Sequence, residues 1–170
     1  MNAKSEKKLL YSIFIVSILF LVYLLRRPPI KDWLLAYLFN AFSNILIDAF
    51  IVSKRMLSYP VRLFPKVLNS NFLFDTIVYP TIMVLFNQVT RHDSVLLIFS
   101  KVFLFTVPIL LFEMWAVQNT SFIHWDKGWN WKHSFVSITL KSLLNRLIIE
   151  VIRKIDNLRS PHKYSHVFDR

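Results

Sequence analysis

The sequence predicts an all-α fold, an integral membrane bundle of four to five transmembrane helices. The chain of 170 residues is 55 % hydrophobic and only 18 % charged, and its mean hydropathy is +0.44. Soluble domains are on average about one-quarter charged. The apolar residues form long runs that are separated by short groups of Lys and Arg. This distribution is typical of residues at the edges of membrane spans.

The length allows one domain with a short segment at either end. We expect a basic N-terminal segment at residues 1–8, a single helical membrane domain at 9–155 and a polar C-terminal tail at 156–170. Gly128 is the single glycine, and the chain has no cysteine. Nucleotide-binding loops and the nucleophile elbow need several glycines, and disulfides, iron–sulfur clusters and thiol catalysis need cysteine. These classes are therefore excluded, and we expect no cofactor.

The net charge of +11 does not point to nucleic acid. Binding nucleic acid would need a basic surface on a folded soluble domain. Here the cations lie between apolar runs, where they can contact anionic lipid headgroups. Each such contact stabilises membrane binding by about 1 kcal/mol. We expect a bilayer with anionic headgroups as the partner, no nucleic acid, and either a protein partner or a homo-oligomer in addition.

The first apolar run, Leu9 to Leu25, is at the short end of what crosses a bilayer core of about 30 Å. Basic residues precede it as in a signal peptide, but no small-x-small cleavage site follows. We expect an uncleaved first helix that is ended by Pro28 and Pro29, because proline cannot continue the hydrogen-bond ladder of a helix.

The second run, Trp33 to Val52, is long enough to span but carries four polar residues. Asn40, Ser43, Asn44 and Asp48 share one helical stripe. Two interpretations stay open at this stage. The stripe is either the polar edge of an interfacial or bundle-facing helix, or one wall of a polar cavity within the membrane.

The remaining chain predicts an extended linker and three helices. In the linker, Pro60 and Pro65 disfavour helix at the residues that precede them. Arg62 lies between these prolines and is flanked by aromatic residues. A kink is expected at Pro108, and the Trp-rich turn around Gly128 is expected at the membrane interface. The linker covers Ser53 to Ser70, and the helices cover about Asn71 to Val89, Val95 to Val117 and Ser134 to Ile155.

Several short motifs together resemble a known family. They are Arg-Pro-Pro-Ile-Lys-Asp-Trp at 27–33, Tyr-Pro-Val-Arg-Leu-Phe-Pro at 59–65, Phe-Asp at 74–75, Tyr-Pro at 79–80, Asn-Gln at 87–88, then Pro108, Glu113 and Trp115, and Trp-x-x-Gly-Trp-x-Trp at 125–131. Residues 7–155 are thereby similar to the "CBO" locus-tag family, small multi-pass membrane proteins of spore-forming Gram-positive bacteria. The resemblance implies a multi-pass protein of a bacterial cell membrane. It implies no activity, ligand or catalytic residue.

A first candidate site follows from helices that alternate in direction. The end of helix two, the start of helix three, the end of helix four and the start of helix five then share one face of the membrane. This brings together one polar cluster, formed by Asp48, Arg62, Asp75, Glu113 and His133. Charges inside spans generally face the bundle interior or an aqueous cavity. The alternative is that these side chains snorkel to water or cap helix ends.

A second polar set is expected toward the opposite face, formed by Asn87, Lys101, Arg146 and Glu150. The last two are one turn apart and can pair on one helix. The five histidines are scattered, so we expect no metal site, and no catalytic constellation is recognisable.

The function class that these observations favour is a non-enzymatic membrane module, acting in assembly, as an accessory subunit, or in binding lipid or a partner. The alternative is a small transporter or channel protomer that uses the intramembrane carboxylates, and a lipid-modifying membrane enzyme is the third class. The Lys and Arg of the loops divide evenly between the two sides, so the positive-inside rule assigns no orientation.

Overall fold

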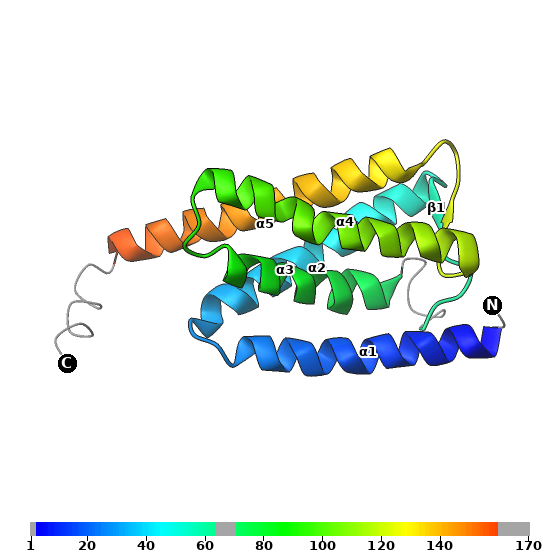
Figure 1. Cartoon of the computed structure of the whole chain (residues 1–170), viewed down its shortest axis with the longest axis horizontal. Coiled ribbons are helices and arrows are strands. Elements are labelled where there is room, and N and C mark those ends of the chain that lie inside the picture. The colour runs from blue at the N-terminus through cyan, green and yellow to red at the C-terminus, as the bar shows by residue number, and fades with distance from the viewer. Residues whose placement is uncertain (1–2, 64–70, 160–170) are drawn as a thin grey trace.

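A computed structural model describes residues 3–63 and 71–159 of the chain, and the all-α prediction is confirmed (Figure 1). Two-residue strands and one π-helical segment accompany the α-helices. The elements are α1 (Ala3–Leu25), α2 (Ile30–Ser53), β1 (Leu57–Ser58), η1 (Phe74–Val78), α3 (Tyr79–Val89), α4 (Val95–Asn119), β2 (His124–Trp125) and α5 (Trp131–Arg159). The predicted C-terminal tail lies outside the described residues from position 160 onward.

The helices lie side by side, and α3 together with η1 is the central one (Figure 1). It packs against α2, α1, α5 and α4. One end of the bundle carries the two strands, and we call it the hairpin end. The start of α1, the end of α2, the start of η1, the end of α4 and the start of α5 meet there (Figure 1). The alternating arrangement predicted from the sequence is therefore present.

The helices extend beyond the apolar runs that predicted them. α1 begins at Ala3 instead of Leu9, so the basic residues 4–8 belong to the helix and not to a separate segment. Within this stretch Glu6 is buried and its carboxylate accepts the Ser121 amide N–H at 3.0 Å. α2 begins at Ile30, and α5 runs three residues earlier and four residues later than expected. An apolar run marks the part of a helix that avoids water. Lys and Glu also favour helix, so the helix continues beyond the apolar run.

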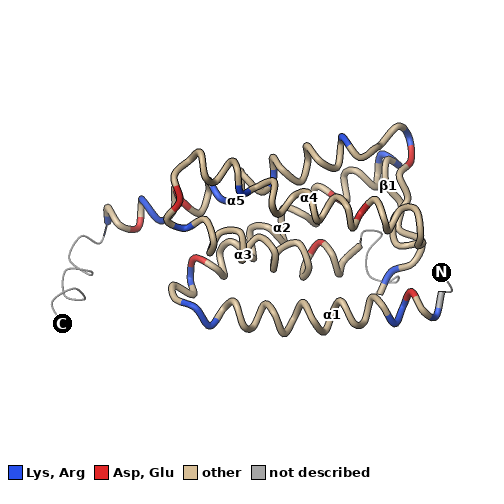
Figure 2. Tube along the Cα trace, in the orientation of Figure 1, with Lys and Arg blue, Asp and Glu red and all other residues tan. Residues whose placement is uncertain are grey.

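Three helices are long and apolar enough to cross a membrane, at Lys4–Leu25, Ile30–Ser53 and Val95–Asn119. The second of them is the segment whose spanning the sequence leaves open. The charged residues of α1 lie near its start, Arg26 and Arg27 follow its end, and the stretch between them is uncharged (Figure 2). These lengths and compositions identify a membrane protein.

The outside of the bundle is largely apolar, and polar side chains are buried inside it beside an apolar core. On α2, the stripe residues Asn40, Asn44 and Asp48 are buried, whereas Phe42 and Leu46 are 66 % and 55 % exposed. Ser43, at the edge of the stripe, is half-buried. A soluble helix would present the reverse pattern. The stripe therefore faces the bundle, and the apolar faces meet the hydrocarbon of a bilayer.

Buried asparagines join α2, α3 and α5. The Asn44 amide donates to Asn40 Oδ1 at 3.0 Å, and the Asn87 amide donates to Asn145 Oδ1 at 2.8 Å. Asn145 in turn donates to the Ala36 carbonyl of α2 at 3.1 Å. We call these four asparagines the asparagine ladder. Interhelical hydrogen bonds of this kind hold helices together where surrounding lipid removes the hydrophobic drive for association.

A short antiparallel ladder closes the hairpin end. Leu57 pairs with Trp125, and Ser58 pairs with His124. Beyond these pairs, the Asp126 N–H donates to the Met56 carbonyl at 2.8 Å and the Val61 N–H donates to the Ser121 carbonyl at 2.9 Å. The segment after α2 and the turn after α4 are therefore fixed to one another.

Candidate acidic cavity

A cavity of about 310 Å³ lies at the hairpin end, between α2 and α5. It is backed by η1, the start of α3, and α4. Three carboxylic acids and one lysine line it, and each comes from a different element: Asp48 from α2, Asp75 from η1, Glu113 from α4 and Lys141 from α5. Asn44, Tyr59, Tyr79 and Ser134 add further polar groups. We call this site the acidic cavity.

Two of the carboxylates are held by neutral donors. Asp48 Oδ1 accepts the Tyr59 hydroxyl at 2.5 Å. Glu113 Oε1 accepts the Trp125 indole N–H at 3.0 Å and the Ser134 hydroxyl at 2.7 Å. Such donors orient a carboxylate but supply no opposite charge.

Tyr59 lies in the segment that follows β1 and remains a hydrogen-bond donor. Burial, and then the neighbouring charge of Asp48, raise the pKa of the Tyr59 hydroxyl well above its usual value. The hydroxyl therefore keeps its proton at neutral pH and donates it toward the carboxylate.

The π-helical turn η1 positions the third carboxylate. A π turn widens the helix locally and occurs frequently at functional sites. Here the main-chain carbonyls of Asp75 and Thr76 accept hydrogen bonds from the α2 side chains Asn44, at 2.9 Å, and Tyr37, at 2.7 Å. The widened turn is thereby fixed to α2 on the side where Asp75 lines the cavity.

Lys141 enters the acidic cavity from α5. Its ammonium lies over the ring of Tyr79, 5.2 Å from the ring centroid. The charges of Asp75, Asp48 and Glu113 act on it. Among the described residues, however, Lys141 forms no ion pair within 4.0 Å and no hydrogen bond. Lys141 therefore lies in the same cavity as the three carboxylic acids but forms no ion pair with them.

The mouth of the cavity faces the apolar flank of the bundle. The lining residues Ile47 of α2 and Leu140 and Leu144 of α5 are large apolar side chains, and all three are more than 40 % exposed. An opening with such a rim meets hydrocarbon in a bilayer. A molecule entering sideways from the membrane would meet this apolar rim first.

The structure brings together three of the five residues predicted for the first cluster: Asp48, Asp75 and Glu113. His133 is exposed, and its ring contacts Asn130 Oδ1 at 3.0 Å and packs on Trp129. Arg62 is half-buried in the segment after β1, and the described lining of the cavity does not include it. Sequence reasoning missed Lys141, Tyr59, Tyr79 and Ser134. For Lys141 the signal was a lone charge within an otherwise uncharged part of helix five.

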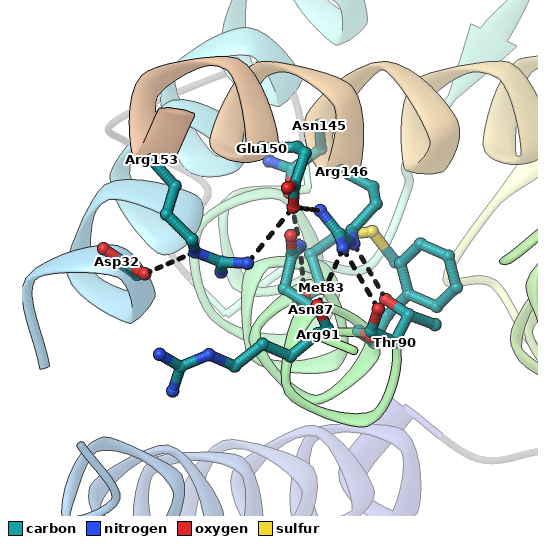
Figure 3. Close-up of polar contacts among 10 residues, drawn as sticks. Asp32, Met83, Asn87, Thr90, Arg91, Asn145, Arg146, Glu150 and Arg153 are labelled. Carbon is teal, nitrogen blue, oxygen red and sulfur yellow. Dashed lines mark hydrogen bonds and ion pairs between the residues drawn. The ribbon is translucent and has the colours of Figure 1, made fainter. Parts of the chain in front are cut away.

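The second predicted set divides into a structural clamp, which Figure 3 shows, and a separate ion pair of Lys101. Arg146 pairs with Glu150 at 2.7 Å, as the spacing predicts. The guanidinium also donates to the Thr90 hydroxyl at 3.1 Å and to the Thr90 carbonyl at 3.0 Å, which lies at the C-terminal end of α3. A cation there satisfies free carbonyls and complements the helix dipole. Lys101 lies apart from this group and pairs with Asp93 at 2.7 Å.

The clamp has no capacity left for a ligand, because each guanidinium nitrogen of Arg146 already has a partner. Glu150 is shared with Arg153, which also pairs with Asp32 of α2 at 3.0 Å (Figure 3). These contacts tie α2, α3 and α5 together. The second set therefore holds the fold, and the acidic cavity is the candidate functional site.

Within the described residues, no group of three or more His, Cys, Asp or Glu side chains has an arrangement that could hold a metal ion. Comparisons with family models, with curated proteins and with solved structures find no match to this chain. The resemblance to the "CBO" locus-tag family stays a prediction from its motifs.

Proposed function

We propose that this protein is a non-enzymatic module of a bacterial cell membrane and that its acidic cavity binds an amphiphile bearing a protonated amine. The bacterial setting rests on the motif resemblance. The ligand class rests on the cavity: three carboxylic acids and one lysine surround a space that opens to the apolar flank of the bundle.

The observation that carries the proposal is that two carboxylates of the acidic cavity, Asp48 and Glu113, form no ion pair within the described residues. Asp48 and Glu113 accept hydrogen bonds from uncharged donors, and Lys141 forms no ion pair with a described residue within 4.0 Å. A buried charge without an opposite charge is unfavourable by several kcal/mol. An ammonium group donates three hydrogen bonds and would supply the missing charge.

The position of the mouth supports an amphiphile over a water-soluble amine. Its apolar rim, which includes Ile47, Leu140 and Leu144, would contact the hydrocarbon part of a ligand while the polar head enters the cavity. Such a ligand leaves no polar group in hydrocarbon.

Calorimetric titration of the detergent-solubilised full chain tests this proposal. We expect dodecylamine to bind and dodecanol, which has the same chain without the charge, not to bind. Glu113→Gln keeps the side-chain shape but removes the charge. It should lower the affinity for dodecylamine at least about tenfold. Asp93→Asn, a matched change at the opposite end of the bundle, should leave binding unchanged. Equal binding of the amine and the alcohol would overturn the proposal.

A small transporter or channel protomer is the second candidate, and the asparagine ladder favours it. The ladder continues from Asn44, in the cavity lining, toward the Arg146 clamp near the other end. Within the described chain, Asn40 Nδ2 and Asn87 Oδ1 are buried without a hydrogen-bond partner, as polar groups along a hydrated path would be. Amine-dependent ion flux into proteoliposomes, lost in Asn40→Leu, would establish transport. If the protein binds dodecylamine but produces no flux, the transporter is wrong and the binding module is supported.

A further inference from the structure

Beyond the ammonium site, the acidic cavity contains donors suited to an anion. We propose that Lys141 and Tyr79 bind an anionic phosphate group of the same ligand, so that the ligand is zwitterionic and carries an ammonium and a phosphate ester. This inference rests on the proposed function, because it extends the amine site to a second subsite.

The first observation is the state of the two donors. Lys141 Nζ has the Tyr79 ring as its close partner, at 5.2 Å, and no acceptor among the described residues. The Tyr79 hydroxyl likewise has no hydrogen-bond partner in the part of the chain that the structure describes. Both residues line the acidic cavity. Because neither donor has an acceptor among the described residues, an acceptor bound in the cavity would give each of them a hydrogen bond.

The second observation is the separation of the two kinds of group. Glu113 is held by Trp125 and Ser134, and Asp48 is held by Tyr59, so these carboxylates are fixed by neutral donors and not by Lys141. A cavity that presents fixed acceptors and a separate cation is complementary to a ligand carrying both charges.

The chemistry of lysine favours a phosphate as the anion. Its ammonium is a compact point charge that binds phosphate without needing a planar partner. The mouth of the cavity opens to the apolar flank of the bundle, where membrane lipids are the available ligands. An aminophospholipid headgroup has both required charges, and soluble phosphoethanolamine shares this chemistry without a hydrocarbon chain.

The test compares three probes on the full chain in detergent: lysophosphatidylethanolamine, dodecylamine and O-phosphoethanolamine. We expect wild-type protein to bind lysophosphatidylethanolamine about tenfold more tightly than dodecylamine. Lys141→Met should reverse this order. It removes the cation that binds the phosphate, which lowers the affinity for lysophosphatidylethanolamine, and it removes a positive charge that repels dodecylamine, which raises the affinity for dodecylamine. Lys132→Met, an exposed lysine of the same helix, is the matched control and should preserve the order.

Two further variants protect the test against simple misfolding. Lys141→Arg keeps the positive charge and should retain binding of lysophosphatidylethanolamine. Tyr79→Phe keeps the ring under Lys141 and should weaken only the phosphate-bearing probes, by several-fold. Wild-type preference for O-phosphoethanolamine over the lysophospholipid would identify a soluble zwitterion as the source of the ligand and would support the subsite.

The failure of this inference differs from the failure of the proposed function. If wild-type protein binds dodecylamine more tightly than lysophosphatidylethanolamine, and Lys141→Met leaves both affinities unchanged, the phosphate subsite is wrong and the amine site stands. If no probe bearing an amine binds to folded wild-type protein, the amine site is wrong as well.

Discussion

Asp48 shows how one buried charge defines the role of a helix. An ionised Asp that faces lipid near the centre of a bilayer is unfavourable by about 2.5–3.5 kcal/mol. In this protein the side chain is buried, lies on the inward stripe of α2 and accepts the Tyr59 hydroxyl. The stripe thus faces the bundle, and two of its residues, Asn44 and Asp48, form part of the cavity wall.

Replacing Asp48 by Leu should leave membrane insertion intact, because the change makes α2 more apolar. Amine binding should fall at least about tenfold, since one of the acceptors of the ammonium is lost. Leu46→Ala changes a 55 % exposed residue of the same helix and should alter binding little. Calorimetry on protein recovered from membranes measures both. Unchanged binding in Asp48→Leu would show that this carboxylate takes no part in the site.

Arg146 is the residue whose loss should most affect stability at the other end of the bundle. Arg146→Met removes the guanidinium donor of the Thr90 carbonyl, which keeps the Asp93 N–H, and removes one of the two cations at Glu150. Losing the hydrogen bonds of a charged group is unfavourable by about 2 kcal/mol, and Glu150 is partly exposed and keeps Arg153. We expect a correspondingly lower free energy of unfolding in detergent. Lys154→Met, an exposed change on the same helix, should have almost no effect, and a similar loss in both variants would contradict the clamp.

At the scale of elements, the π turn η1 fixes the direction of Asp75. Deleting Thr76 should convert Phe74–Val78 to regular α-helix and rotate the preceding residues by about 100° relative to α3. Asp75 would then leave the cavity. We expect helix content by circular dichroism to be preserved while amine binding is lost. Retained binding would show that the widened turn is unnecessary for the site.

The elements differ in how far the sequence could predict them. The inward stripe of α2 follows from helical spacing alone, and the alternating directions of the helices correctly bring Asp48, Asp75 and Glu113 together. In α5 polar residues occur around the whole helix, so spacing does not select the inward face. One residue corresponds to a rotation of about 100°, which is why His133 is exposed while Ser134 is buried.

The strands left no usable pattern in the sequence. Each is two residues long, and their pairing joins positions 57–58 to 124–125. Alternation over two residues cannot be distinguished from chance, and pairing across such a distance depends on how the helices between them pack. Arg62 follows this ladder, so its position depends on a contact that the sequence did not reveal.

At the scale of the whole molecule, many large apolar side chains are exposed on the helices while a set of polar side chains is buried among them. The three apolar helices α1, α2 and α4 should therefore keep the protein in membranes after washing with alkaline carbonate. A peripheral protein that is held through its +11 charge would be released by the same wash. Immunoblotting of pellet and supernatant distinguishes the two, and recovery in the supernatant would contradict the membrane assignment.

The short ladder at the hairpin end also links two carboxylates mechanically. Tyr59, next to β1, holds Asp48 of α2, and Trp125, within β2, holds Glu113 of α4. These two helices share no extensive contact in the described part of the chain, so main-chain hydrogen bonds between the strands form the connection. We expect a displacement of either side chain to be passed to the other through these strands, so that a ligand bound in the cavity would also shift the connecting loops.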